Sequence, residues 1–134
     1  MLSVIAGIVL ASLVVNVMDA LSTHLYPLPA GASDSADSMR QAVRSLPRPA
    51  FLIILIGWVT GAAVGAYAAC EFSGRKAKWP GIAVGLIVLV AAVVPMFALP
   101  HPRWLWAAAI VFVPAAGVAG SRFALRHPPD MDPL

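Results

Sequence analysis

Residues 50–70 of the chain read AFLIILIGWVTGAAVGAYAAC, and this stretch decides the class of the fold. It carries no charged side chain over a length that suits one crossing of a bilayer, because a hydrocarbon core about 30 Å thick takes roughly 20 helical residues. A soluble protein of this size has too small an interior to bury such a helix on all sides. The stretch therefore predicts a transmembrane helix.

Three further apolar blocks of similar length lie at about residues 2–21, 81–99 and 104–120. Hydrophobic residues make up 60% of the 134-residue chain and charged residues only 11%, against about 25% charged residues in a typical soluble domain. We therefore predict an all-α, integral membrane four-helix bundle, built as two helical hairpins, over residues 1–127. The tail over residues 128–134 is predicted to be disordered.

The segment between the first two apolar blocks is the most polar part of the chain. Its apolar side chains recur at spacings of three and four, which places them on one face of a helix: Ala36, Met39, Val43 and Leu46. We predict a short amphipathic helix over about residues 33–46 that lies on the membrane surface.

Lysine and arginine are divided almost equally between the two ends of the predicted bundle. One end carries five of them, namely Arg75, Lys76, Lys78, Arg122 and Arg126, and the other end carries four, namely Arg40, Arg44, Arg48 and Arg103. Because cytoplasmic loops are enriched in these residues, the tight cluster at 75–78 favours an orientation with both termini in the cytoplasm. The net charge of +3 is explained by this topology, and no basic cluster interleaved with aromatic residues indicates nucleic-acid binding.

Glycines recur at a spacing of four along the second apolar block and reappear in the third and fourth blocks. They are Gly57, Gly61, Gly65, Gly81, Gly85, Gly117 and Gly120. In lipid, faces of small residues let two helix backbones approach closely, so such faces mark helix contacts. We interpret them as packing faces inside one bundle, and the alternative is an interface between copies in a homo-oligomer.

Polar side chains form a second stripe, on the first predicted helix. Ser12, Asn16, Asp19 and Thr23 are spaced four, three and four apart, so they share one face. Polar groups inside a membrane usually face the bundle interior or a cavity. We interpret the stripe as a set of interhelical hydrogen bonds that fixes packing. The alternative is a path for protons or cations that would continue to Glu71.

Two histidines, His24 and His101, are expected at the same membrane surface, close to Asp19. Zinc sites take three or four protein ligands at recognisable spacings, and this chain has no such spacing. We therefore predict no metal site, no cofactor and no catalytic residue, since no nucleophile is paired with an oriented base.

Four short motifs together span nearly the whole chain: LYPLP at 25–29, the glycine run at 57–65, HPRW at 101–104 and PAAG at 114–117. In these motifs the chain resembles small four-span bacterial inner-membrane proteins of uncharacterised function. The resemblance implies a multi-pass protein of the inner membrane and implies no activity.

These observations favour a protein without catalytic activity, embedded in the lipid bilayer. We expect a packing or accessory subunit that self-associates or joins a larger membrane complex. The first alternative is a small channel or a proton- or cation-linked transporter that uses Asn16, Asp19 and Glu71. The second is an enzyme that acts on a lipid or quinone at the outer surface, with His24, Asp19 and His101 as its candidate residues.

Overall fold

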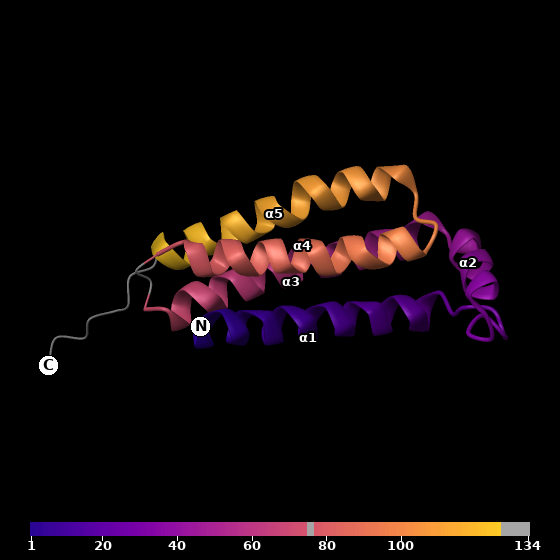
Figure 1. Ribbon diagram of the computed structural model, residues 1–134, viewed down its shortest axis with the longest axis horizontal. Helices are drawn as coiled ribbons and strands as arrows, with labels where there is room; N and C mark the ends of the chain where they lie inside the picture. Colours follow the sequence, from indigo (N-terminus) through magenta and orange to yellow (C-terminus); the bar gives the residue numbers. More distant parts are fainter. Residues whose placement is uncertain (75–76, 127–134) are drawn as a thin grey trace, which may run out of the picture.

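The computed structural model describes residues 1–74 and 77–126, and over these ranges the chain is helical, without strands. Its helices are α1 (Leu2–Leu25), α2 (Ala36–Ser45), α3 (Arg48–Phe72), α4 (Trp79–Ala98) and α5 (Arg103–Arg126). All except α2 are long and apolar enough to span a membrane, and they run along the long axis of the molecule (Figure 1). The predicted all-α four-helix membrane bundle is confirmed.

Two of the long helices extend beyond the predicted apolar blocks. α1 continues past Leu21 to Leu25, and its last turn is closed by the backbone N–H of Tyr26, which donates to the carbonyl of Ser22. α5 continues past Gly120 to Arg126, because Ser121 and Ala124 of this extension are buried against the bundle. The tail predicted to be disordered, residues 128–134, lies outside the described residues, as do Arg75 and Lys76 of the basic cluster.

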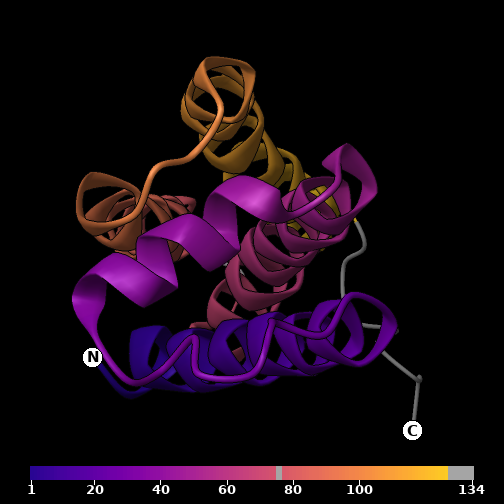
Figure 2. The same cartoon turned by 90° about the vertical axis from the view of Figure 1, so that its right-hand side faces the viewer.

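α3 is the central helix of the bundle. It packs against α1, α4 and α5, whereas α1 and α5 make no close approach to each other within the described ranges. Half of the most apolar window of α3 (50%) is buried inside the protein, against 11% of the corresponding window of α1. The end-on view in Figure 2 shows α1 and α5 on opposite sides of α3. The bundle is therefore uneven, with α1 as a peripheral helix that lipid surrounds on most sides.

α2 lies across one end of the bundle (Figures 1 and 2). It begins at Ser35, whose hydroxyl oxygen accepts a hydrogen bond from the backbone N–H of Ser38, the usual arrangement for a serine N-cap. Two residues of α2, Ala42 and Val43, are buried, while Arg44 of the same helix stays exposed. The predicted amphipathic helix is therefore present, and its apolar face covers the end of the bundle.

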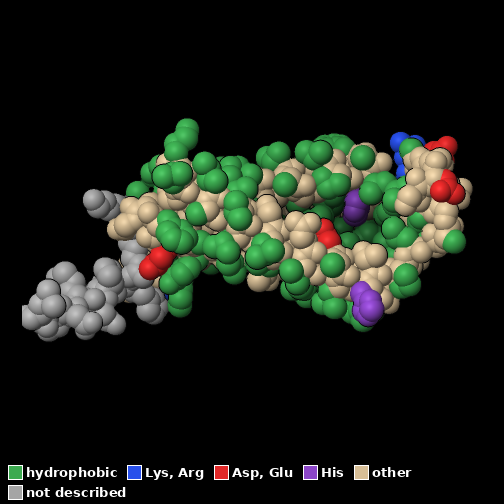
Figure 3. Space-filling view, turned by 90° about the horizontal axis from the view of Figure 1, so that it is seen from below, with side chains coloured by type: hydrophobic (Ala, Val, Ile, Leu, Met, Phe, Trp, Pro, Cys, Tyr) green, Lys and Arg blue, Asp and Glu red, His purple; other side chains and the backbone are tan. Residues whose placement is uncertain are grey.

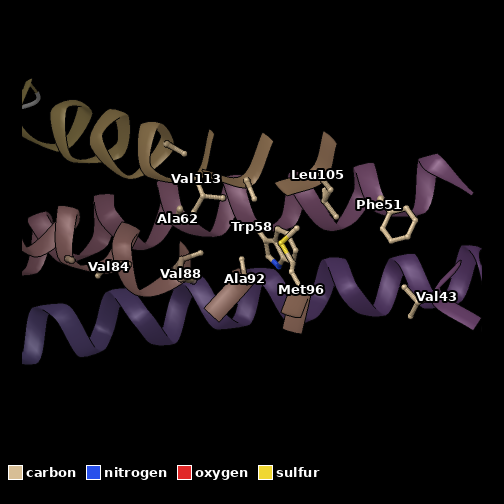
Figure 4. Packing of buried hydrophobic residues seen from close by; sticks show 14 residues of the cluster. Val43, Phe51, Trp58, Ala62, Val84, Val88, Ala92, Met96, Leu105 and Val113 are labelled. Carbon is tan, nitrogen blue, oxygen red and sulfur yellow. The ribbon is translucent and has the colours of Figure 1, made fainter. Parts of the chain in front are cut away.

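The buried core is built mostly from small and β-branched side chains, with two aromatic residues, Phe51 and Trp58. Figure 4 shows Val84, Val88, Ala92 and Met96 following one another along the inner face of α4. Because few of these side chains are long, the helices lie close together, and glycines occupy the points of nearest approach.

The glycine stripe of α3 faces α1. A Cβ atom added at Gly57 would lie 2.7 Å from the Cβ of Met18, and one added at Gly61 would lie 3.0 Å from the carbonyl oxygen of Ala11. Real Cβ atoms are not found at the shorter of these distances, so the two backbones meet where side chains are missing.

The remaining glycines of the predicted faces also meet helices of the same chain. Gly85 of α4 and Gly117 of α5 face each other, with a Cβ added at Gly85 only 3.1 Å from the Cα of Gly117. Gly81 lies against Ala66 of α3, and Gly120 lies against the backbone of Ala63. The structure thus places every one of the predicted packing glycines on a contact within one bundle.

Candidate binding chamber between α1 and α4

A cavity of about 380 Å³, here called the chamber, lies at the α2 end of the bundle. Side chains of α1, α3 and α4 form its walls, and it is covered by Met39 and Val43 of α2 and by Leu46, which follows this helix. Figure 3 shows the hollow from the outside, with an acidic side chain and a histidine at its edges. The residues of these types in the lining of the chamber are Asp19 and His101.

A narrower cavity of about 190 Å³ continues from the chamber along α1. Ser12 and Asn16 line it from α1, and Ile87 and Val88 line it from α4. The two cavities have three lining residues in common: Val15, Trp58 and Ala91. We therefore describe them together as the α1–α4 groove.

The polar stripe of α1 lies along this groove. Ser12 and Asn16 line the narrow part, and Asp19 and Thr23 line the chamber. The amide of Asn16 donates to the carbonyl of Ser12 (2.7 Å), and the hydroxyl of Thr23 donates to the carbonyl of Asp19 (2.9 Å). Both bonds close within α1, so the expected interhelical hydrogen bonds are not formed by these two side chains.

Asp19 is exposed to the groove. Within the described residues its carboxylate takes part in no hydrogen bond or ion pair, although its backbone carbonyl accepts from Thr23. A carboxylate at this depth is costly unless a partner compensates it. The chamber therefore presents a negative group that no described side chain of the protein compensates.

A polar side chain that does connect two helices is Ser22, which was not among the predicted polar residues. It is buried, and its hydroxyl donates to the carbonyl of Ala50 in α3 at 3.3 Å. A signal for it exists in the sequence. Gly7, Ala11, Met18 and Ser22 are spaced four, seven and four apart, which defines the face that meets α3.

The two histidines have different surroundings. His101 lines the chamber, and its ring packs edge-on against Phe51 with 5.8 Å between the ring centroids. Its Nδ1 lies 3.0 Å from the carbonyl oxygen of Leu99, and since a carbonyl carries no proton, Nδ1–H is the donor. His24 is exposed and does not line the chamber. Of the three residues expected at one surface site, the structure brings only Asp19 and His101 to the chamber.

The groove is closed at the end that lies away from α2. A Cβ atom added at Gly7 would lie 2.5 Å from the carbonyl oxygen of Gly65 and 2.9 Å from a methyl carbon of Val84, so even a methyl group does not fit. Glu71 lies near the far end of α3, whereas the chamber lies at the opposite end, where Phe51 lines it. The groove is thus open near α2 and blind towards the other membrane surface.

Known proteins offer no relative from which a function can be transferred. Comparison with the models of known protein families, with curated proteins and with solved structures finds no match for the chain. Within the described residues no group of three or more His, Cys, Asp or Glu side chains is arranged to hold a metal ion. A proposal for the function therefore has to rest on the chamber and the groups that line it.

Proposed function

We propose that this multi-pass membrane protein is non-catalytic and binds an amphiphilic molecule from the bilayer in the α1–α4 groove. The observation that carries the proposal is the orientation of the polar stripe, whose four side chains all line this one groove. Pockets for small ligands combine a mostly apolar lining with a few polar groups that fix the orientation of the ligand. The groove has this composition, with Phe51 and Trp58 among its apolar walls.

The depth of the chamber suits a ligand that enters from the membrane. Asp19 lies six residues before the end of α1 at Leu25, which is about 9 Å along the helix axis. The polar group of an amphiphile lies near this depth, where head groups meet hydrocarbon. Its apolar part would then extend along Trp58 and Ala91 into the narrow part of the groove.

The closed end of the groove favours binding over permeation. A channel needs polar groups or water across the whole hydrocarbon region, and the contact of Gly7 with Gly65 and Val84 is apolar and tightly packed. The predicted accessory role is not supported by the glycine faces, because these glycines are occupied by contacts within the chain. An enzymatic role lacks an oriented base, since no hydrogen bond joins Asp19 to His101 in the described residues.

Photolabelling tests the proposal directly. A dodecanol that carries a diazirine in its chain would be added to the protein in phosphatidylcholine nanodiscs, and labelled residues would be located by mass spectrometry. We expect labelling concentrated on the segments that line the groove, residues 12–26 and 87–99. Labelling spread evenly over these segments and the exposed face of α5 would contradict the proposal.

A pair of matched variants sharpens this test. Ala91 is exposed to the groove where its two parts meet, so Ala91→Trp fills the groove. We expect groove labelling in this variant to fall to the level of the lipid-facing residues of α5. Ala107→Trp places the same side chain on an exposed position of α5 and should leave groove labelling unchanged.

We also propose that both termini face the cytoplasm, on the basis of the lysine and arginine bias; location in a bacterial inner membrane stays a prediction from the resemblance. In a Cys70→Ala background, Ser35→Cys should react with a membrane-impermeant maleimide in intact cells, and Ala77→Cys should not. These positions lie near opposite ends of the bundle. The reverse pattern of labelling would overturn the orientation.

A further inference from the structure

Most hydrogen-bond donors on the polar side chains around the chamber are already used by the protein. The hydroxyl of Ser22 donates to Ala50, that of Thr23 donates to Asp19, and Nδ1–H of His101 donates to Leu99. What these side chains retain are acceptors, namely the hydroxyl oxygens and, in a neutral imidazole, Nε2. The donors that remain are the Tyr26 hydroxyl and the Trp58 indole N–H.

The backbone of α4 adds a further acceptor at the wall of the chamber. Pro95 lies inside α4 and has no N–H, so the carbonyl of Ala91, four residues earlier, lacks its usual helical donor. Both residues line the chamber. Together with the carboxylate oxygens of Asp19, this carbonyl makes the site richer in acceptors than in donors.

The charges that line the chamber favour a cationic ligand. Asp19 is the acidic residue of its lining, and no lysine or arginine of the described chain lines it. Arg44 and Arg48 line a neighbouring cavity of about 350 Å³, which adjoins the chamber through Val43, Leu46, Phe51 and His101 but does not include Asp19. α1 and α4 both end at the chamber, where their partial negative charges favour cations, while α3 begins there. The rings of Phe51 and Trp58 also attract a cation placed over their faces.

We infer that the chamber selects an amphiphilic primary ammonium, bound with its cationic head at Asp19 and its alkyl chain along Trp58. An ammonium group offers three donors and no acceptor, which is the complement of the groups that line the chamber. A quaternary ammonium keeps the charge and loses the donors, and a phospholipid phosphate would place an anion against the acceptors. This inference rests on the proposed function and names the class of its ligand.

Competition against the diazirine dodecanol tests the inference in wild-type protein. Dodecylamine, dodecyltrimethylammonium and dodecanol would be added to phosphatidylcholine nanodiscs, and the mole fraction that halves groove labelling would be compared. Because the ammonium group adds charge-assisted hydrogen bonds to Asp19, dodecylamine should act at a mole fraction on the order of tenfold lower than dodecanol, which corresponds to about 1.4 kcal/mol. The quaternary compound should fall between them. Equal potency of all three would overturn the inference.

Substitutions at Asp19 identify the group responsible. Asp19→Asn should abolish the preference for dodecylamine, whereas Asp19→Glu should keep the order of the three compounds. Asp34→Asn removes one negative charge from an exposed loop outside the chamber and should leave the preference unchanged. A preference that survives Asp19→Asn would overturn the inference, and should that variant fail to fold, the wild-type order of potency decides.

Two further results separate the inference from the proposal beneath it. Failure of the diazirine dodecanol to label the groove at all would contradict the proposed function. Labelling of the groove without a preference for the primary ammonium would contradict only the ligand class. Phosphatidylethanolamine added to the bilayer should leave labelling unchanged, and displacement of the probe by this lipid would contradict the exclusion of a phosphate.

Discussion

The two halves of α1, which both pack on α3, approach α4 in different ways. In the first half, Gly7 and Ala11 are buried, with the backbone of Gly7 against Gly65. In the second half, Asn16 and Asp19 are exposed along the α1–α4 groove. The difference follows from side-chain size, because small residues let backbones touch and larger ones hold helices apart. The first half of α1, here called the anchored half, is thus packed between α3 and α4, and the second half, here called the open half, borders the groove.

The largest effect is expected in the anchored half, from Gly65→Leu. A Cβ atom at this position would lie 2.6 Å from the carbonyl oxygen of Gly7 and 2.8 Å from the Cβ of Ala11, and backbone atoms cannot rotate away. We expect the free energy of unfolding to fall by about 3 kcal/mol, the upper end of the usual cost of overpacking. Thermal unfolding in detergent would measure this change.

The neighbouring position provides the control for that substitution. Val64 is exposed on the outer face of α3, so Val64→Leu should change stability by less than about 0.5 kcal/mol. Equal stability of the two variants would show that Gly65 faces lipid, and the anchored half of the comparison would then fail.

An intermediate effect is expected from Ser22→Ala, which removes the buried hydrogen bond between α1 and α3. The carbonyl of Ala50 loses this donor, and a hydrogen bond between membrane helices contributes about 0.6–1 kcal/mol. Thr23→Val removes a hydrogen bond that closes within α1 on an exposed side chain, so its cost should be smaller. A larger cost for Thr23→Val in the same unfolding assay would contradict this assignment of faces.

The smallest effect on stability is expected from Asp19→Leu in the open half. Because no described residue pairs with this carboxylate, its removal should change the free energy of unfolding by less than about 0.5 kcal/mol, or stabilise the protein. A fall of 1 kcal/mol or more in the free energy of unfolding would show that Asp19 holds the helices together, in agreement with the prediction that the stripe forms interhelical hydrogen bonds.

The helices were predictable because their signals lie in short stretches of the sequence. Long apolar blocks predict the four spans, and the spacing of Met39 and Val43 predicts the amphipathic helix. The shared face of Ser12, Asn16, Asp19 and Thr23 was equally readable from helical periodicity. Periodicity does not say which helix, if any, covers that face. The central place of α3 and the cavities between α1 and α4 arise from contacts between distant segments, and these contacts decide that the stripe borders a groove.

The composition of the chamber was predictable only in part, for the same reason. His101 comes from the connection between α4 and α5, far from Asp19 in sequence, and reaches the chamber only through the fold. Both histidines were predicted to lie near Asp19, and the prediction was wrong for His24, which the helical rotation of α1 leaves outside the chamber. Pro95 lacks an N–H whatever the fold, but the place of the carbonyl that this leaves without a donor, at the wall of the chamber, depends on the packing of α4.

The central claim is that the polar stripe borders an open groove, and nitroxide labels on α1 test it most directly. Single cysteines at positions 11, 16 and 19, in the Cys70→Ala background, would carry the label in nanodiscs, with oxygen collision rates and mobility read by electron paramagnetic resonance. We predict mobile, oxygen-accessible labels at 16 and 19, and an immobile or unreactive site at 11, which is buried. Labels at 16 and 19 as immobile and inaccessible as the label at 11 would contradict the claim.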